Sequence, residues 1–185
     1  MSWLPAGART AGRVGDRRVL IPLLVTLVTA LAVNAATSFR VNLSGSMPRG
    51  LYRLTADPPR RGSIVAFCLD EESAALAVER RYTGSGPCPG GGEPLVKPVA
   101  ATEGDVVTTT RRSVTLNGIP LASSTTLVTD SNGRPLPHHP FGRYRLAPGE
   151  LWVFSPAPRS WDSRYLGPIR RDQVVATVVP ILTIR

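Results

Sequence analysis

The chain begins with two contrasting blocks. Residues 1–18 are rich in Gly and Ala and hold four arginines against one aspartate, whereas the 21 residues from Val19 to Phe39 contain no charged side chain. As an α-helix this run would extend about 31 Å, which is close to the hydrocarbon thickness of a bilayer. The pattern therefore predicts a transmembrane anchor over residues 19–39, preceded by a basic cytoplasmic tail over residues 1–18.

A cleaved signal peptide is the alternative interpretation of this segment. The basic start, the apolar stretch and the small residues around Val33-Asn34-Ala35 fit that pattern as well. Charge decides the orientation only weakly, because several arginines also follow the apolar run. We favour an uncleaved anchor with a cytoplasmic N-terminus, since a domain as long as residues 40–185 is translocated largely regardless of its charge.

After residue 40 the pattern changes to short runs of β-branched and aromatic residues separated by turn signals. The pair Asn117-Gly118 lies between two such runs and predicts a β-hairpin. One helix is predicted over about Asp70–Arg81, where acidic residues come first and arginines last. The fold class is thus mostly β with one short helix, with strands expected over 50–54, 63–67, 95–101, 105–110, 113–116, 143–146, 150–154 and 174–179.

Composition agrees with this class and narrows the functions. Eighteen prolines and 17 glycines argue against a helical bundle. The net charge of +9 comes from arginines dispersed along the chain, without an arginine-rich helix or a pattern of stacking aromatics. We therefore expect no nucleic-acid partner, and anionic lipid headgroups account for the same charge.

The two cysteines, Cys68 and Cys88, bracket the predicted helix. In an oxidising compartment they would close this excursion as a disulfide, and two independent thiols are the alternative. The adjacent His138 and His139 do not complete a zinc-binding spacing with them. We expect neither a metal nor a cofactor.

The candidate chemistry begins immediately after the apolar run, where two serines, Ser44 and Ser46, precede Met47-Pro48. A serine needs a base before it can attack a carbonyl. Both histidines lie in a proline-flanked turn, which is more typical of a surface loop. The remaining candidate base is Lys97, the only lysine among 22 basic residues, and it lies in an uncharged apolar run.

Lysine can act as a base only if it loses its proton, which arginine cannot do in a protein. At pH 7 the neutral form of a free lysine costs about 4.6 kcal/mol to populate. Burial in apolar surroundings lowers a lysine pKa by up to about 3–5 pH units, enough to offset this cost. The sequence thus predicts a Ser46–Lys97 pair of the kind known from Ser-Lys hydrolases.

A third polar segment comes late in the chain. Asp162 and Arg164 are spaced to form an ion pair that would fix a loop, and Ser160 is placed to orient the Lys97 amine. A polar surface turn is the simpler interpretation of this segment taken alone.

Together, three segments resemble the Ser/Lys signal peptidases, and most closely the TraF branch of conjugative transfer. They are Ser44-Gly45-Ser46-Met47-Pro48, the lysine strand ending in Glu103-Gly104-Asp105, and the segment from Ser160 to Pro168. The Gly-Asp-Asn-Arg stretch typical of general type I enzymes is replaced by Phe154-Ser155-Pro156-Ala157-Pro158, which favours the TraF-like branch.

The resemblance implies a signal-peptidase-like (LexA-like) β-ribbon domain over residues 40–185, on the outer face of the bacterial inner membrane. It implies that Ser46 is the nucleophile and Lys97 the general base. It also implies an oxyanion hole formed by Ser44 and the Ser46 N–H, with Ser160, Asp162 and Arg164 supporting the site. In this branch the aspartate is also described as a catalytic member.

The expected partners are a precursor protein carrying a signal peptide or pilin leader, and the lipid bilayer; the oligomeric state stays open. The apolar run also has a function in this hypothesis. Ser46 lies seven positions after Phe39, at most about 25 Å of extended chain, so the site would be held near the membrane. The alternatives are a general type I signal peptidase, a self-cleaving repressor-type protease, and a non-catalytic membrane-anchored factor of a secretion or pilus apparatus.

Overall fold

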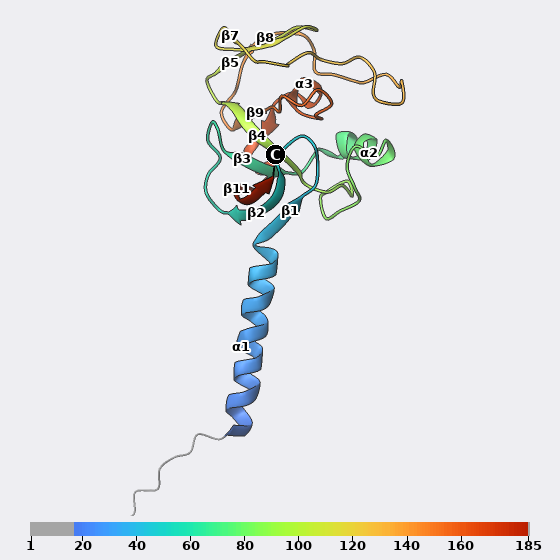
Figure 1. Ribbon diagram of the computed structural model, residues 1–185. Coiled ribbons are helices and arrows are strands. Elements are labelled where there is room, and N and C mark those ends of the chain that lie inside the picture. The colour runs from blue at the N-terminus through green and yellow to red at the C-terminus, as the bar shows by residue number, and fades with distance from the viewer. Residues whose placement is uncertain (1–16, 185) are drawn as a thin grey trace, which may run out of the picture. The chain divides into compact units, whose positions relative to one another are not determined.

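The computed structural model describes residues 17–184 and divides into two compact units, a helical one that ends at Ser38 and a β unit that begins at Phe39 (Figure 1). In the first unit, helix α1 spans Arg17–Thr37. It ends two residues before the predicted boundary, because Phe39 already pairs with Arg53 in the β unit. Among the described residues no helix is both long and apolar enough to cross a membrane. The anchor over 19–39 therefore stays a prediction, and most of the predicted tail, residues 1–16, lies outside the described residues.

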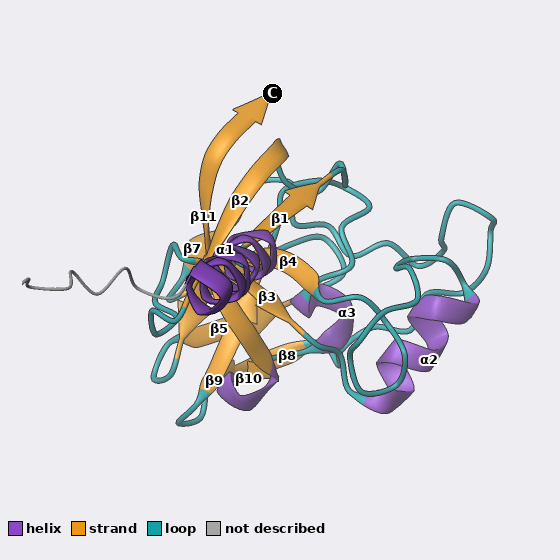
Figure 2. Ribbon diagram, turned by 90° about the horizontal axis from the view of Figure 1, so that it is seen from below, coloured by secondary structure: helices purple, strands orange, loops and turns teal. Residues whose placement is uncertain are grey.

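The β unit consists of two antiparallel sheets, so the mostly-β expectation is confirmed. The larger sheet has seven strands in the order β1 (Phe39–Asn42), β2 (Arg49–Thr55), β11 (Val174–Ile184), β3 (Ile64–Phe67), β4 (Leu95–Thr102), β9 (Glu150–Val153) and β10 (Ile169–Arg170). The smaller has four, in the order β7 (Ile119–Pro120), β6 (Val114–Leu116), β5 (Val106–Thr109) and β8 (Gly142–Arg145). Figure 2 shows β1, β2 and β11 running side by side.

All eight predicted strands are present, seven within one residue of their expected bounds and β11 five residues longer than expected. Strands β1 and β10 are additional. The predicted hairpin forms between β6 and β7. Its two turn residues, Asn117 and Gly118, have φ angles of 52° and 84°. Positive φ at both positions defines the turn that matches the twist of the strands and explains the preference for Asn-Gly.

We expected one helix in this domain, and the described residues of the domain contain more than one. The predicted helix is α2 (Glu71–Glu79), capped by the Asp70 carboxylate, which accepts from the Ser73 N–H at 2.9 Å. A second, short helix, α3 (Ser163–Leu166), and the 3₁₀ turn η1 (Arg171–Gln173) follow later. One turn of helix is too short to show a 3.6-residue hydrophobic period, which is the signal that identifies longer helices.

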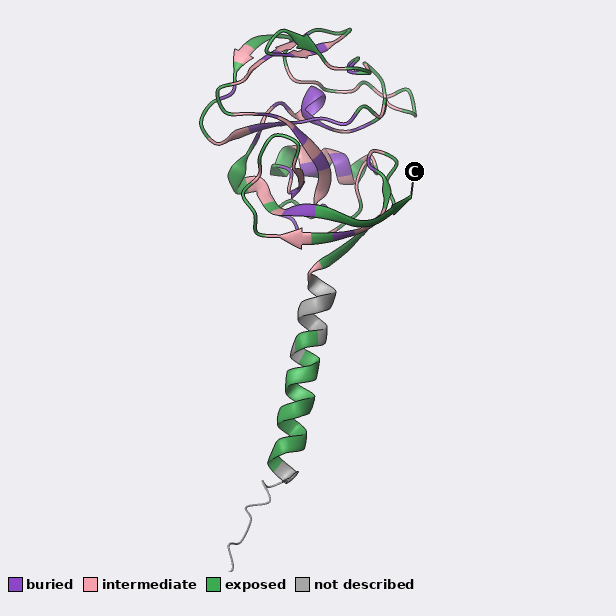
Figure 3. Ribbon diagram, turned by 60° about the vertical axis from the view of Figure 1, so that its left-hand side comes forward, coloured by how far each residue is buried: buried purple, intermediate pink, exposed green. Residues whose placement is uncertain are grey.

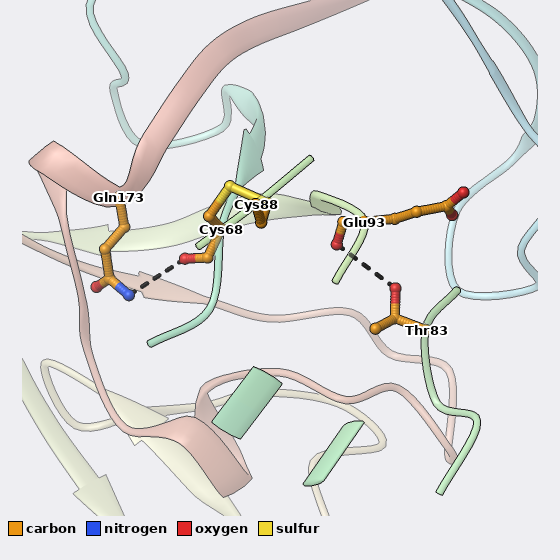
Figure 4. The surroundings of a disulfide bond; sticks show 5 residues. All are labelled: Cys68, Thr83, Cys88, Glu93 and Gln173. Atoms are coloured by element: carbon orange, nitrogen blue, oxygen red, sulfur yellow. Dashed lines mark hydrogen bonds between the residues drawn. A yellow bond between two sulfur atoms is a disulfide. The ribbon is translucent and has the colours of Figure 1, made fainter. Parts of the chain in front are cut away.

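Cys68 and Cys88 form a disulfide, with their Cα atoms 5.5 Å apart. The bond closes the excursion that contains α2, and Figure 4 shows the Gln173 amide donating to the Cys68 carbonyl beside it. This is the pairing that the sequence offered as one of two possibilities. The disulfide joins the two ends of this excursion, and the hydrogen bonds between Cys68 and Gln173 connect it to the residue before β11.

The buried face of β4 positions the one lysine. Along this strand Lys97, Val99 and Ala101 are buried, alternating with half-buried neighbours, as expected where successive side chains point to opposite faces. Val99 packs with residues of β3 and β9, and Ala101 packs with Trp152 and Val107 toward the smaller sheet. Figure 3 shows this buried layer where the strands of the β unit meet. The lysine therefore continues a row of core positions.

Candidate active site

The two serines of the first segment lie in the connection between β1 and β2. These strands pair up to Asn42 opposite Gly50, and residues 43–48 form the loop of a hairpin between them. In this loop Ser44 is exposed and Ser46 is half-buried, while Met47 is buried and anchors its far side. We call residues 44–48 the nucleophile turn.

Lys97 approaches this turn from β4, where it lies opposite Val65 of β3. The side chain is only 5% exposed. Its Nζ lies 2.6 Å from Ser46 Oγ, although the two residues are 51 positions apart in the sequence. The structure thus brings the predicted serine and lysine into direct hydrogen-bond contact.

Burial lowers the pKa of Lys97 to about 8, because removing the ammonium group from water disfavours its charged form. The charge of Asp162 acts in the opposite direction, and that of Arg164 adds to the lowering. With a pKa of about 8, about one tenth of the lysine is neutral at pH 7. This is the form that accepts a proton from a serine hydroxyl.

Ser44 is close enough to take part in the same chemistry. Its Oγ lies 3.2 Å from Ser46 Oγ and donates to the Asn42 side-chain oxygen at 2.8 Å. Within the described part of the chain, the Ser46 backbone N–H has no acceptor. The Ser44 hydroxyl thus lies beside Ser46 Oγ, with its hydrogen directed to Asn42 in this structure.

Asp162 and Arg164 form the ion pair that the sequence predicted. Arg164 donates from Nε and Nη2 to the two carboxylate oxygens, each at 2.9 Å, and both side chains are fully buried. The remaining guanidinium hydrogens reach backbone carbonyls of two loops, including Thr125 at 3.0 Å and Ala157 at 3.3 Å. A buried pair satisfied in this way fixes the loops that it joins.

The same geometry limits the role of Asp162. Its oxygens bind Arg164 and the backbone N–H groups of Arg164 and Ser155, and it has no hydrogen bond to Lys97 or Ser46 among the described residues. The Asp162 carboxylate therefore lies outside hydrogen-bond reach of Ser46 and Lys97, and it affects Lys97 through its charge. We expected Asp162 to be one of the catalytic residues. Among the described residues, no contact between Asp162 and the reacting atoms supports that expectation.

Ser160 does not make the contact expected of it. Its hydroxyl is buried and has no hydrogen-bond partner within the described chain, so the predicted bond to the Lys97 amine is absent. Arg164 holds Ser160 through the backbone carbonyl, at 3.3 Å. Lys97 Nζ is directed to Ser46 instead.

A groove of about 1110 Å³ opens over these residues. Ser44, Ser46, Lys97 and Ser160 line it, together with apolar side chains from β2, β3, β4 and β11. Asp162 and Arg164 do not line it, and neither do the two histidines. The groove is large enough for several residues of an extended peptide. Its apolar walls shield the Lys97 amine from water.

Three residues that the sequence did not single out hold the nucleophile turn: Asn42, Ser155 and Tyr52, whose hydroxyl donates to the Pro48 carbonyl at 2.7 Å. The Asn42 amide donates to the carbonyls of Pro48 at 3.1 Å and of Ser44 and Met47 at 3.4 Å. Ser155 Oγ donates to the Ser46 carbonyl at 2.5 Å. Ser155 lies in the stretch that differs from the general type I enzymes, and that difference was the only signal that pointed to it.

Comparison with known proteins places this chain in one family. The family model described as "Signal peptidase, peptidase S26" matches residues 15–183, nearly the whole chain. The chain therefore belongs to the signal peptidase family, peptidase S26. A crystal structure of a signal peptidase I from Enterococcus faecalis aligns over 68% of this chain and 100% of that one, with a TM-score of 0.38 and 20% identity.

Within the family, the chain falls among the TraF proteins of conjugative transfer. It is 36% identical to the plasmid transfer protein TraF of Escherichia coli over 146 residues, which cover 78% of this chain and 82% of the relative. It is 32% identical to the probable conjugal transfer protein TraF of Sinorhizobium fredii over 186 residues, which cover 97% of each. The resemblance inferred from the three sequence segments is thereby confirmed.

Proposed function

We propose that the protein is a serine endopeptidase in which Ser46 is the nucleophile and Lys97 the general base. The observation that carries this proposal is the 2.6 Å contact between Ser46 Oγ and the buried Lys97 Nζ. Neutral Lys97 removes the proton as Ser46 Oγ attacks the scissile carbonyl carbon. The negative oxygen of the tetrahedral intermediate then accepts hydrogen bonds from the Ser46 N–H and from the Ser44 hydroxyl, whose hydrogen turns from the Asn42 side-chain oxygen to the oxyanion.

Collapse of this intermediate breaks the peptide bond and leaves an ester on Ser46. The protonated Lys97 gives its proton to the departing amine and is neutral again for the second step. It then activates water, or another nucleophile, which releases the acyl group from Ser46. Each oxyanion donor contributes about 2.7–4 kcal/mol to stabilising the transition state in enzymes of this type.

The substrate that we propose is a precursor protein with an N-terminal leader, of the pilin or exported type, in conjugative transfer. The conjugal and plasmid transfer functions named for the relatives support this choice. The open, largely apolar groove over Ser46 fits an extended segment of a leader peptide.

We also propose that residues 19–39 anchor the protein in the bacterial inner membrane, with the catalytic domain on the periplasmic side. This proposal rests on the full sequence, which has no charged residue between Val19 and Phe39. The Cys68–Cys88 disulfide agrees with an oxidising compartment for the domain. Extraction of the expressed protein with alkaline carbonate tests the anchor, because an integral protein stays in the membrane pellet.

Co-expression of candidate pilin precursors with the wild type and with Ser46→Ala tests the activity. Mass spectrometry should find the mature product only with the wild type, at equal levels of both proteins. Lys97→Arg should behave like Ser46→Ala. Normal processing by either variant would refute the proposal and favour a non-catalytic role in assembly.

A further inference from the structure

The nucleophile turn has little support of its own. Ser44 and Gly45 are exposed, and a Cβ added to Gly45 would meet no atom within 4 Å. Asn42 holds the turn from the β1 side through the carbonyls of Ser44, Met47 and Pro48. Asn42 holds neither the Gly45 carbonyl nor that of Ser46, the nucleophile itself.

Ser155 supplies the missing contact from the opposite side. Its hydroxyl donates to the Ser46 carbonyl at 2.5 Å, across 109 positions of sequence, and the residue is 1% exposed. It lies two residues after the end of β9, the strand that pairs with the Lys97 strand. One buried hydroxyl thus ties the carbonyl of the nucleophile to the strand next to that of its base.

Ser155 is itself fixed by the buried ion pair. Its N–H donates to Asp162 Oδ2 at 3.2 Å, and its carbonyl accepts from Arg164 Nη2 at 3.4 Å. A continuous set of hydrogen bonds therefore runs from the Asp162–Arg164 pair through Ser155 to Ser46. Asp162 does not contact the reacting atoms, yet it acts on the nucleophile through this path.

We infer that Ser155 is a positioning residue that holds Ser46 in line with Lys97, an inference that rests on the proposed function. Fixing the Ser46 carbonyl fixes the backbone on both sides of the nucleophile, and hence the direction of Oγ toward Nζ and of the N–H toward the oxyanion. Displacements of about 1 Å in such sites cost on the order of 10²-fold in rate. The contact affects the reacting geometry rather than the binding of peptide, because Ser155 does not line the groove.

The test compares Ser155→Ala with the wild type in steady-state cleavage of a precursor peptide by the full-length protein in detergent. We expect kcat to fall by about 10- to 100-fold with KM within twofold. The midpoint of the pH–rate profile should stay where it is, because Lys97 keeps its buried position. Ser155→Thr, which keeps the hydroxyl, should recover most of kcat, and Ser155→Cys, a poorer donor of similar size, should be intermediate.

Thr177→Val is the matched control, since Thr177 Oγ1 also donates to a backbone carbonyl, that of Asp57 at 2.7 Å, in a buried position outside the groove. It should lower thermal stability while leaving kcat unchanged. If Ser155 has only a structural role, Ser155→Ala should behave like Thr177→Val, with lower thermal stability and unchanged kcat. If Ser155→Ala does not fold, the inference is tested by comparing Ser155→Cys with Ser155→Thr, and kcat should be lower in the Cys variant.

The inference is overturned if Ser155→Ala, or failing that Ser155→Cys, cleaves with wild-type kcat while Ser46→Ala is inactive. Equal losses of kcat in Ser155→Ala and Thr177→Val would overturn it as well. If Ser46→Ala retains full cleavage, the proposed function itself fails. The two failures are therefore distinguishable in one set of proteins.

Discussion

Replacing Lys97 by arginine is the substitution that tests the chemistry most directly. It keeps a positive charge and a long side chain beside Ser46, and it removes only the ability to become neutral near physiological pH. Burial of Lys97 brings its pKa from 10.5 to about 8, which corresponds to about 3 kcal/mol. An arginine in the same place keeps a pKa far above the working range.

These values set the expected size of the effect. At pH 7 a lysine with a pKa of 10.5 is neutral in about one molecule in 3000, and with a pKa of about 8 in about one in ten. Acylation of Ser46 by the wild type should therefore rise about tenfold between pH 7 and pH 9, with a midpoint near 8, and then level off. Lys97→Arg should lose about 10²- to 10⁴-fold, the usual contribution of a general base, at every pH tested.

An activated p-nitrophenyl ester makes the assay independent of the natural substrate. The purified protein is mixed with the ester at a series of pH values, and intact-mass spectrometry follows the appearance of the acyl adduct. Ser46→Ala provides the background at each pH, and peptide mapping places the adduct on Ser46. Lys97→Met, with a neutral side chain of similar length, shows whether the arginine result reflects bulk or charge.

Two results would contradict this reasoning. Acylation that is independent of pH between 6 and 10 would mean that Lys97 is not the titrating base. A Lys97→Arg variant that acylates within about tenfold of the wild type at pH 8 would mean that a neutral amine is not needed. Either result would remove Lys97 from the mechanism even with its Nζ in contact with Ser46.

Three further predictions concern stability. Because the pKa of Lys97 is lowered in the folded state, the unfolded chain binds more protons than the folded one between about pH 8 and pH 10.5. Over that window the free energy of unfolding of the wild type, measured in urea, should rise by up to about 3 kcal/mol relative to that of Lys97→Met. A difference between the two proteins that does not change with pH would contradict the lowered pKa. Asp162→Ala leaves Arg164 buried without its partner and should cost about 3–5 kcal/mol in the same assay, and a loss below about 1 kcal/mol would show that water replaces the carboxylate. Replacing Cys68 and Cys88 together by serine should cost about 3 kcal/mol for a loop of this length, measured as the change in unfolding midpoint, and an unchanged midpoint would mean that the disulfide is absent from the native protein.

The local pattern of the sequence was sufficient to predict most of the secondary structure. Strands such as β3 and β4 are short apolar runs between turn residues, and α2 begins at a capping aspartate, so that each is encoded within a few neighbouring residues. The strands and helix that were missed are short. Strands β1 and β10 have four and two residues, and their pairing partners supply the stability that their own sequences do not show.

The sequence by itself determined which groups are capable of the chemistry: a pair of serines, one lysine in apolar surroundings, and an acidic and a basic residue spaced for an ion pair. Only the tertiary structure decided how they meet. It brought Ser46 to Lys97, kept Asp162 out of the groove, and left the Ser160 hydroxyl without a hydrogen-bond partner among the described residues. It also placed Ser155, Asn42 and Tyr52 where they hold the nucleophile turn. The physical reason is that these contacts join strands and loops up to 109 positions apart, and their geometry depends on sheet order and register, which no local pattern of residues encodes.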